Sequence, residues 1–170
     1  LGSQYFMHNK HMNNGSIVFT FSETVNVSTI VPGRISVSDG LNAVYTLTGG
    51  FSNQLFSDVV AFNISQNDVN SIKAINNLAT AMNTTFLYLR SQAVLDMNRN
   101  PNVDALNVPA SGFVKDNENP FLNAFSLDMN TGNLILFFDE TVDITSMLIS
   151  QLVLSSATQT YNLTIYAGSI

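Results

Sequence analysis

The sequence of 170 residues predicts an all-β protein: an antiparallel β-sandwich with a short helical insertion, followed by a second, incomplete unit of the same kind. Three observations lead to this fold class. Apolar residues alternate at a period of two in several short segments, as in strands with one buried face. Turn residues separate these segments every ~8–12 residues, which is the spacing typical of a sandwich. One strand-like stretch also occurs twice, as in an array of similar units.

The first half of the chain alternates most clearly. Ile17, Phe19 and Phe21 fall on one face of a predicted strand, and Ile35 and Val37 fall on one face of another. Asn, Asp, Gly and Pro mark the turns, because Asn and Gly tolerate positive φ and Pro presets a turn geometry. The predicted strands lie at residues 17–21, 35–37, 45–48 and 60–64, and the predicted turns at 13–15, 32–33, 39–40 and 49–50.

One segment departs from the period of two. Apolar residues recur every third position from Val69 to Leu78. This spacing predicts a short helix over Asn67–Thr80, with Asn67 as its N-cap. Strands are predicted again at 85–90, 93–97 and 103–114. A polar linker then ends at Pro120, a residue that cannot donate to a sheet ladder.

The repeated stretch reads MNNGSIVFTFSETVNVS from Met12 and MNTGNLILFFDETVDIT from Met129. Strand, turn and post-strand residues all agree, which makes coincidence a poor explanation. The chain therefore divides into a segment at 1–11, a complete unit at 12–115, a linker at 116–120 and a partial unit at 121–170. Matched positions are Gly15 with Gly132, Phe21 with Phe138, Glu23–Val25 with Glu140–Val142 and, after a slip of one residue, Tyr45 with Tyr161.

These residues resemble the tandem immunoglobulin-like (Ig-like) repeats of large extracellular proteins of algae and other protists, and of bacterial S-layer and adhesin proteins. Such repeats carry a GTLTLTFSETVD stretch, then YTLTGG and later VxDxxGNP. The matches here are Gly15–Asn26, Tyr45–Gly50 and Val94–Pro101, with Arg99 where the family usually has Gly. The resemblance implies an Ig-like β-sandwich that serves as a structural or adhesive spacer outside the cell.

Composition excludes several classes of function. The net charge is −6, and the six basic residues are scattered, so no phosphate-binding stripe forms and nucleic acid is not an expected partner. No apolar run approaches the ~18 residues of a membrane helix, so membrane insertion is not expected. Cysteine is absent, which excludes disulfides and thiolate metal sites.

Asparagine is abundant, and it forms five N-x-S/T sequons. Sequons are acceptors for N-linked glycans in secreted eukaryotic proteins, where they lie on the surface. Two of the five are out of phase with apolar neighbours, two flank the first strand in or near turns, and one lies between the helix and the next strand. Covalent glycans are therefore expected if the source is eukaryotic. In a bacterial source the same residues would be polar surface only. The five are Asn14, Asn26, Asn63, Asn83 and Asn162.

Other residues that could carry chemistry form weak patterns. His8 and His11 stand in a stretch that reads as extended, which would place them on opposite faces rather than around a metal. Recurring acidic residues could gather around Ca²⁺, but turn carboxylates that accept from local N–H groups are the simpler interpretation. No nucleophile motif accompanies the histidines. We expect no enzyme activity, cofactor or metal, although paired carboxylates for sugar hydrolysis stay open.

The partial unit needs strands that residues 121–170 do not contain. Its edges and one apolar face would be covered either by a continuing chain or by another chain. Ile135 and Phe137 make both faces of one strand apolar, which predicts an interface. The expected donor is the N-terminal segment of another copy, through Tyr5 and Met7. Such head-to-tail contacts build filaments when they do not close.

Together these features predict an extracellular or cell-surface structural protein. In the leading hypothesis it is a glycosylated subunit that polymerises head-to-tail with itself into a fibril by strand complementation. One alternative is a non-assembling segment of a multi-repeat cell-surface adhesin or stalk. A third is a carbohydrate-binding or carbohydrate-active module, since Tyr and Phe could line a sugar-binding face, although Trp is absent.

Overall fold

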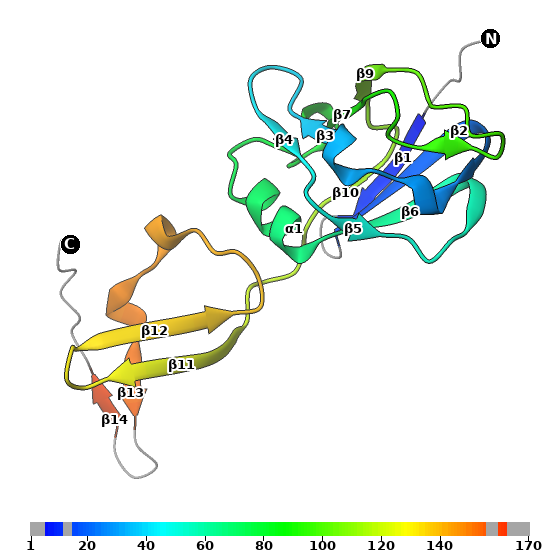
Figure 1. Ribbon diagram of the computed structural model, residues 1–170. Helices are drawn as coiled ribbons and strands as arrows, with labels where there is room; N and C mark the ends of the chain where they lie inside the picture. The colour runs from blue at the N-terminus through cyan, green and yellow to red at the C-terminus, as the bar shows by residue number, and fades with distance from the viewer. Residues whose placement is uncertain (1–5, 12–14, 156–159, 163–170) are drawn as a thin grey trace.

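The computed structural model describes residues 6–11, 15–155 and 160–162. Figure 1 shows a larger part and a smaller part that are joined by an extended stretch of chain. We call residues 6–114 the body and residues 121–162 the C-terminal hairpins. Most of the regular structure is antiparallel β-sheet, which confirms the predicted all-β class.

One sheet of the body is built around its longest strand. Across the sheet the order is β10 (Phe113–Val114), β1 (Phe6–His11), β2 (Ser16–Asn26), β6 (Phe56–Ile64) and β5 (Gly50–Phe51), while β8 (Leu95–Asp96) pairs with the end of β2. β2 is antiparallel to β1 and β6, and Ile17 lies opposite Phe62. β10 pairs with β1 in parallel, so this sheet is mixed and not purely antiparallel as predicted.

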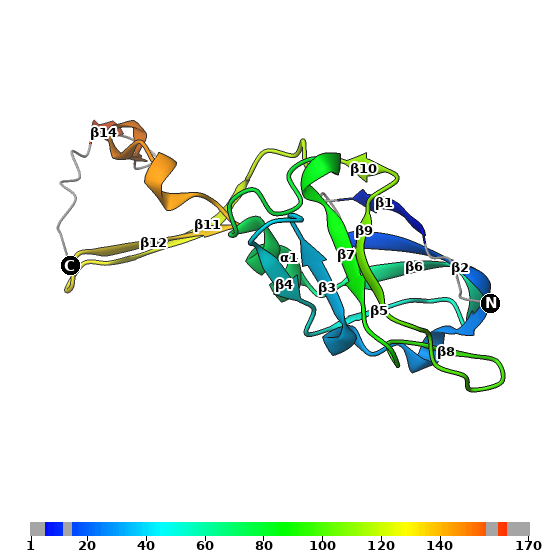
Figure 2. The same cartoon turned by 90° about the horizontal axis from the view of Figure 1, so that it is seen from above.

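The second sheet of the body faces the first. Its order is β4 (Val44–Thr46), β3 (Ile35–Ser38), β7 (Phe86–Leu89) and β9 (Ala105–Pro109), and every pair is antiparallel. Val37 in β3 lies opposite Tyr45 on one side and Leu87 on the other. Figure 2 shows the two sheets as separate layers.

The core of the body lies between these sheets and draws residues from both. Ile17 and Val60 come from the first sheet and Val37 from the second, and all three are fully buried. The ring centroid of Phe19 lies 6.1 Å from that of Phe21 and 6.4 Å from that of Phe62. The alternating residues of the predicted strands are therefore the ones that fill the interior.

The helical insertion is shorter than predicted and begins earlier. Helix α1 spans Gln66–Lys73, and Ser65 is its N-cap, since its side chain accepts from the backbone N–H of Asp68. Asn67 is therefore not the cap. Positive φ angles at Asn77 and Ala79 prevent the helix from continuing to Thr80. Short 3₁₀ turns complete the body: η1 (Val27–Thr29), η2 (Pro32–Arg34) and η3 (Met82–Thr84).

The C-terminal hairpins contain four strands in two separate sheets. β11 (Leu122–Asp128) pairs with β12 (Asn133–Phe138), and β13 (Val153–Ser155) pairs with β14 (Thr160–Asn162), both antiparallel. Two 3₁₀ turns, η4 (Ile144–Ser146) and η5 (Ile149–Gln151), connect them. The order strand, strand, 3₁₀, 3₁₀, strand, strand is the order of β1, β2, η1, η2, β3 and β4 in the body.

The correspondence extends to individual hydrogen bonds. In the body, Asn26 Oδ1 accepts from the N–H and hydroxyl of Ser28 at 3.2 and 2.7 Å. In the hairpins, Asp143 Oδ1 accepts from the N–H and hydroxyl of Thr145 at 2.9 and 2.6 Å. The repeated sequence thus forms the same turn in both places.

The segment at 1–11 lies within the body where it is described. Phe6–His11 form β1, which sits between β2 and β10 in the first sheet. The equivalent place in the hairpins is occupied by β11, because Leu127 opposes Leu134 just as Lys10 opposes Ile17. The stretch predicted as a donor for another copy is thus a strand of its own sheet.

A buried carboxylate connects helix α1 to the turn after β4. The side chain of Asp68 is fully buried. Its oxygens accept from the Tyr45 hydroxyl at 2.8 Å, from the Thr48 hydroxyl at 2.7 Å and backbone N–H at 3.0 Å, and from the Gly49 N–H at 2.9 Å. Burial raises the pKa of Asp68, but hydrogen bonds from Thr48, Tyr45, Gly49 and Ser65 outweigh it and hold the pKa below its usual value.

We predict that Asp68→Ala destabilises the body by about 3 kcal/mol, because several buried donors would lose their acceptor. Chemical denaturation measures the change, and Asp58→Ala, an exposed carboxylate on β6, is the control and should change little. The lowered pKa also sets a pH dependence. The contribution of Asp68 is present above the usual Asp pKa of 3.8 and is lost as pH falls through the lower folded value. Equal stability of the two variants would contradict this role.

Candidate functional site

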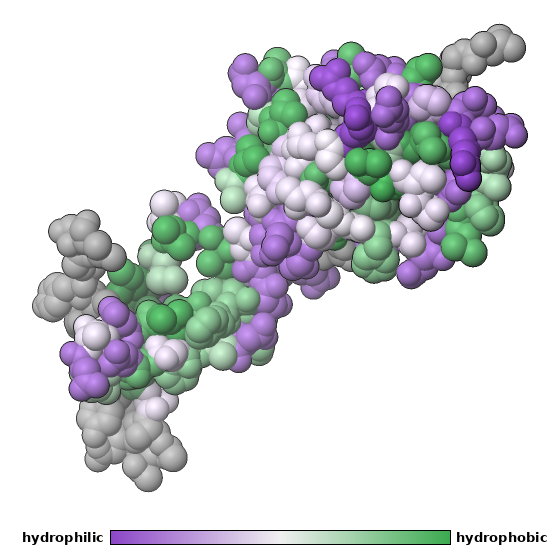
Figure 3. Space-filling model, in the orientation of Figure 1, coloured by the Kyte–Doolittle hydropathy of each residue, from purple (hydrophilic) through white to green (hydrophobic). Residues whose placement is uncertain are grey.

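The C-terminal hairpins enclose an open apolar cavity, which is the strongest candidate for a functional site. Its volume is about 630 Å³, and it opens to solvent. Figure 3 shows hydrophobic surface gathered over β11 and β12. Residues of β11, β12 and β13 and of the connection between the two sheets line it: Leu127, Gly132, Asn133, Leu134, Ile135, Leu136, Phe138, Val142, Ile144, Met147, Ile149, Leu152 and Leu154.

The cavity lies where the body has a filled core. Ile17 and Phe19 in β2 are 0% and 4% exposed, because β6 and the second sheet cover them. Leu134 and Leu136, their counterparts in β12, are only half-buried. The same apolar positions that close the body therefore remain accessible in the hairpins.

The strands of the hairpins also have fewer pairing partners than the equivalent strands of the body. β2 pairs on both sides, with β1 and β6, and β3 pairs with β4 and β7. Within the described ranges, β12 pairs only with β11, and β13 pairs only with β14. Each therefore presents backbone N–H and C=O groups along one edge, which is a template for an added strand.

The outer face of β12 is apolar as well. Ile135 is 53% exposed and Phe137 is 50% exposed, and they lie opposite Ser126 and Ala124 of β11. The sequence predicts an assembly interface that contains both residues together with Tyr5 and Met7. Met7 belongs to β1 in the body, and Tyr5 lies outside the described residues. The structure thus places Met7 in a different sheet from Ile135 and Phe137.

Two ion pairs that share Lys73 connect α1 of the body to the linker and to the hairpins. Lys73, the last residue of α1, places its Nζ 2.6 Å from Asp116 in the linker and 2.6 Å from Glu140 after β12. Burial lowers the pKa of Lys73, but hydrogen bonds with Asp116 and Glu140 outweigh it and raise the pKa above its ordinary value. No signal in the sequence connected these three residues, because their approach depends on how the linker runs.

The structure describes the side-chain exposure of three of the five predicted glycan acceptors, all of which lie in the body. Asn63 is half-buried in β6 between buried Phe62 and Ile64, so it faces outward as predicted. Asn83 is exposed in η3, and Asn26 is half-buried at the start of η1. Asn162 pairs with Val153 through its backbone in β14, and Asn14 lies outside the described residues.

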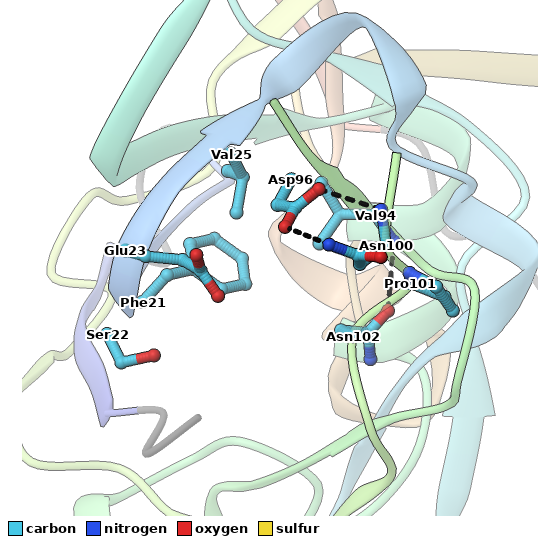
Figure 4. A pocket seen from close by; sticks show the side chains of 9 residues that line it. All are labelled: Phe21, Ser22, Glu23, Val25, Val94, Asp96, Asn100, Pro101 and Asn102. Atoms are coloured by element: carbon cyan, nitrogen blue, oxygen red, sulfur yellow. Dashed lines mark hydrogen bonds between the residues drawn. The ribbon is translucent and has the colours of Figure 1, made fainter. Parts of the chain in front are cut away.

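Four of the acidic residues that could gather around Ca²⁺ act as turn carboxylates: Asp39, Asp96, Asp128 and Asp143. A small pocket of about 30 Å³ contains Glu23 and Asp96 (Figure 4). Asp96 accepts from the N–H groups of Asn98 and Asn100 and from the Asn100 amide. Asp39 and Asp128 likewise accept from N–H groups two or three residues ahead. In the part of the chain that the structure describes, no three His, Cys, Asp or Glu side chains form a cluster suited to a metal ion.

The buried Asp68 lies in α1 of the body and not at the cavity, and the sequence did not predict its role. A signal for it exists, because Ser65 and Asp68 have the spacing of an N-cap and its third helical residue. The period of three had directed attention to Asn67 instead.

Comparison with protein-family models, with curated proteins and with solved structures found no match. None of the helices in the described ranges has the length and apolar character needed to cross a bilayer.

We predict that Lys73→Met loosens the hairpins relative to the body, because both ion pairs lose their cation. Partly buried pairs of this kind contribute about 1 kcal/mol or less each. Small-angle X-ray scattering should show a broader distribution of distances than in the parent chain, and high salt should reproduce part of the effect. Lys115→Met, an exposed neighbour of the linker, is the matched control. Identical scattering from the Lys73 variant would show that the ion pairs do not hold the joint.

Proposed function

We propose that this chain is a structural protein of the cell surface or extracellular space, built of consecutive Ig-like β-sandwich units. In this proposal residues 121–170 are the beginning of a second unit. Strands from outside residues 1–170 close it, so that units join end to end. The observation that carries the proposal is the open apolar cavity between β11–β12 and β13–β14, at positions that are buried in the body.

The energetics favour closure by strands over exposure to water. Each large apolar side chain that becomes buried contributes about 1.5–3 kcal/mol, and each backbone hydrogen bond about 0.5–1.5 kcal/mol net. Leu134, Leu136 and Phe138 alone offer three such side chains on β12. A partner that supplies two strands would therefore bind with enough free energy to offset the loss of its own freedom.

A structural role also agrees with the character of the surface. Only 11% of the residues are charged, although charge is the usual source of solubility. Glycans on the sequons would supply hydration without charge, and the accessible Asn83 and outward-facing Asn63 suit that role. This chemistry belongs to a secreted protein.

A head-to-tail homopolymer is the second candidate, and the apolar outer face formed by Ile135 and Phe137 favours it. Its donor would have to be the N-terminal segment of another copy. β1 already pairs with β2 and β10 in its own sheet, so donation would leave β2 with an open edge. The exchange would form new hydrogen bonds in the hairpins and break as many in the body, so its net free energy is small. We therefore favour closure by other strands.

We predict that the hairpins of the full chain are open in solution. Amide hydrogen exchange of residues 133–138 should be about a hundredfold faster than that of residues 16–21, because β12 lacks the second partner that β2 has. A dye that reports accessible apolar surface should bind, and Leu136→Ser should reduce its binding. Slow exchange in β12 without dye binding would contradict the proposal. Regular filaments in electron micrographs would instead favour the homopolymer.

We also predict that at least three of the five sequons carry glycans in material from a eukaryotic source. The readout is the intact mass before and after enzymatic deglycosylation. Ser28→Ala and Thr85→Ala remove the sequons of Asn26 and Asn83 while keeping the asparagines. A native mass equal to the unmodified 18.5 kDa would refute glycosylation without affecting the argument for strand closure.

A further inference from the structure

We infer that the partner of the C-terminal hairpins is a segment of the same kind as residues 50–114, whose helix carries an aspartate at the position of Asp68. The inference rests on the proposed function and specifies the chemistry of the partner. We call residues 50–114 the closing segment. The strands that it closes, β1–β4 in the body and β11–β14 in the hairpins, are the two frameworks.

In the body the closing segment supplies what the hairpins lack. Its strand β6 pairs with β2, and its strand β7 pairs with β3. Phe62 and Leu87, one from each strand, are buried against the framework. The free edges of β12 and β13 stand at the positions where β6 and β7 would pair. The same pair of strands therefore fits both frameworks.

Two equivalent glycines show where the helix of the partner would pack. A Cβ atom added to Gly15 would clash with Cγ2 of Val69, so α1 packs directly on this turn. Gly132 occupies the same turn between β11 and β12, with φ +73° against +62° at Gly15. Among described atoms nothing lies within 4 Å of a Cβ added there. The space that Val69 fills in the body is thus open in the hairpins.

The polar contact between framework and closing segment is the one made by Asp68. Tyr45 belongs to the framework, in β4, and Asp68 belongs to the closing segment, in α1. The hydroxyl of Tyr45 donates to Asp68 at 2.8 Å. Because the carboxylate is fully buried, it fixes the position of the helix as well as satisfying the donors.

The second framework retains the donor half of this contact. Tyr161 in β14 opposes Leu154, in the register by which Tyr45 in β4 opposes Val37. The sequence YTLT at Tyr45 is YNLT at Tyr161, so the threonine of the contact is present too. A partner with a carboxylate at the position of Asp68 would match these two residue types.

The N-terminal strand of another copy does not match this chemistry. β11 already occupies the place of β1, and residues 6–11 carry no carboxylate. Within the described ranges, residues 50–114 form a closing segment that is engaged in the body. The partner is therefore a further closing segment.

A graft tests the inference. Residues 49–116 of this chain are joined behind Thr164 of the otherwise complete chain, so that the second framework receives its own closing segment. The matched variants carry Asp→Ala or the isosteric Asp→Asn only at the grafted copy of Asp68. Amide exchange of residues 133–138 and dye binding report closure, and the first framework in the same molecule is the internal reference.

The grafted aspartate should slow exchange in residues 133–138 by at least about tenfold relative to the ungrafted chain, and dye binding should fall. Both substitutions should reverse most of that protection. Unchanged exchange in the aspartate graft would overturn the inference. Equal protection in the aspartate and asparagine grafts would overturn the role of the carboxylate. The proposed function is judged separately, on exchange in the ungrafted chain, so its failure is distinguishable from these outcomes.

Discussion

The structure depends on one constraint: a central strand with apolar residues must be paired along both edges and covered on its inner face. β2 meets that constraint, since β1 and β6 flank it and the second sheet covers Ile17 and Phe19. β12 has the same pattern of residues and only one flanking strand within the described ranges. The same residue pattern is thus fully paired and buried in the body and only partly paired and buried in the hairpins. Comparison of the two indicates that the cavity is the place of strands equivalent to β6 and β7.

In the body, strands β6 and β7 that pair with the framework belong to the long closing segment, residues 50–114. This segment must pack against the framework in a defined position, and the buried carboxylate of Asp68 helps to define it. Asp68 does so because it accepts from the turn after β4 while capping interactions with Ser65 hold its own helix. Apolar packing in the core has little directional preference. Hydrogen bonds such as those of Asp68 are directional, so they fix the position of the helix more closely than packing alone.

Local features were predictable from the sequence, and features that depend on long-range pairing were not. The alternation at 17–21, 35–37 and 60–64 placed strands correctly because a half-buried strand imposes a period of two. The place of β1 depends on which edge of β2 is free, and no local pattern encodes that. The parallel pairing of β10 and the approach of Lys73 to Glu140 also depend on the path of the chain. In the hairpins, the apolar Ile135 and Phe137 were visible in the sequence. In the body, the role of Asp68 was obscured by the stronger period of three.

The turn that begins at Asn26 in the body and at Asp143 in the hairpins has a consequence for how such units could diversify. Both side chains accept through Oδ1 alone from the residue two positions ahead. The turn therefore forms equally with Nδ2 of an asparagine or Oδ2 of an aspartate as the second side-chain atom. The amide version forms a sequon with Ser28, and the carboxylate version carries a negative charge instead. A single-base change converts one codon to the other. The same turn can therefore carry either a neutral amide or a negative charge at one fixed location, and its hydrogen bonds to Oδ1 are the same in both cases.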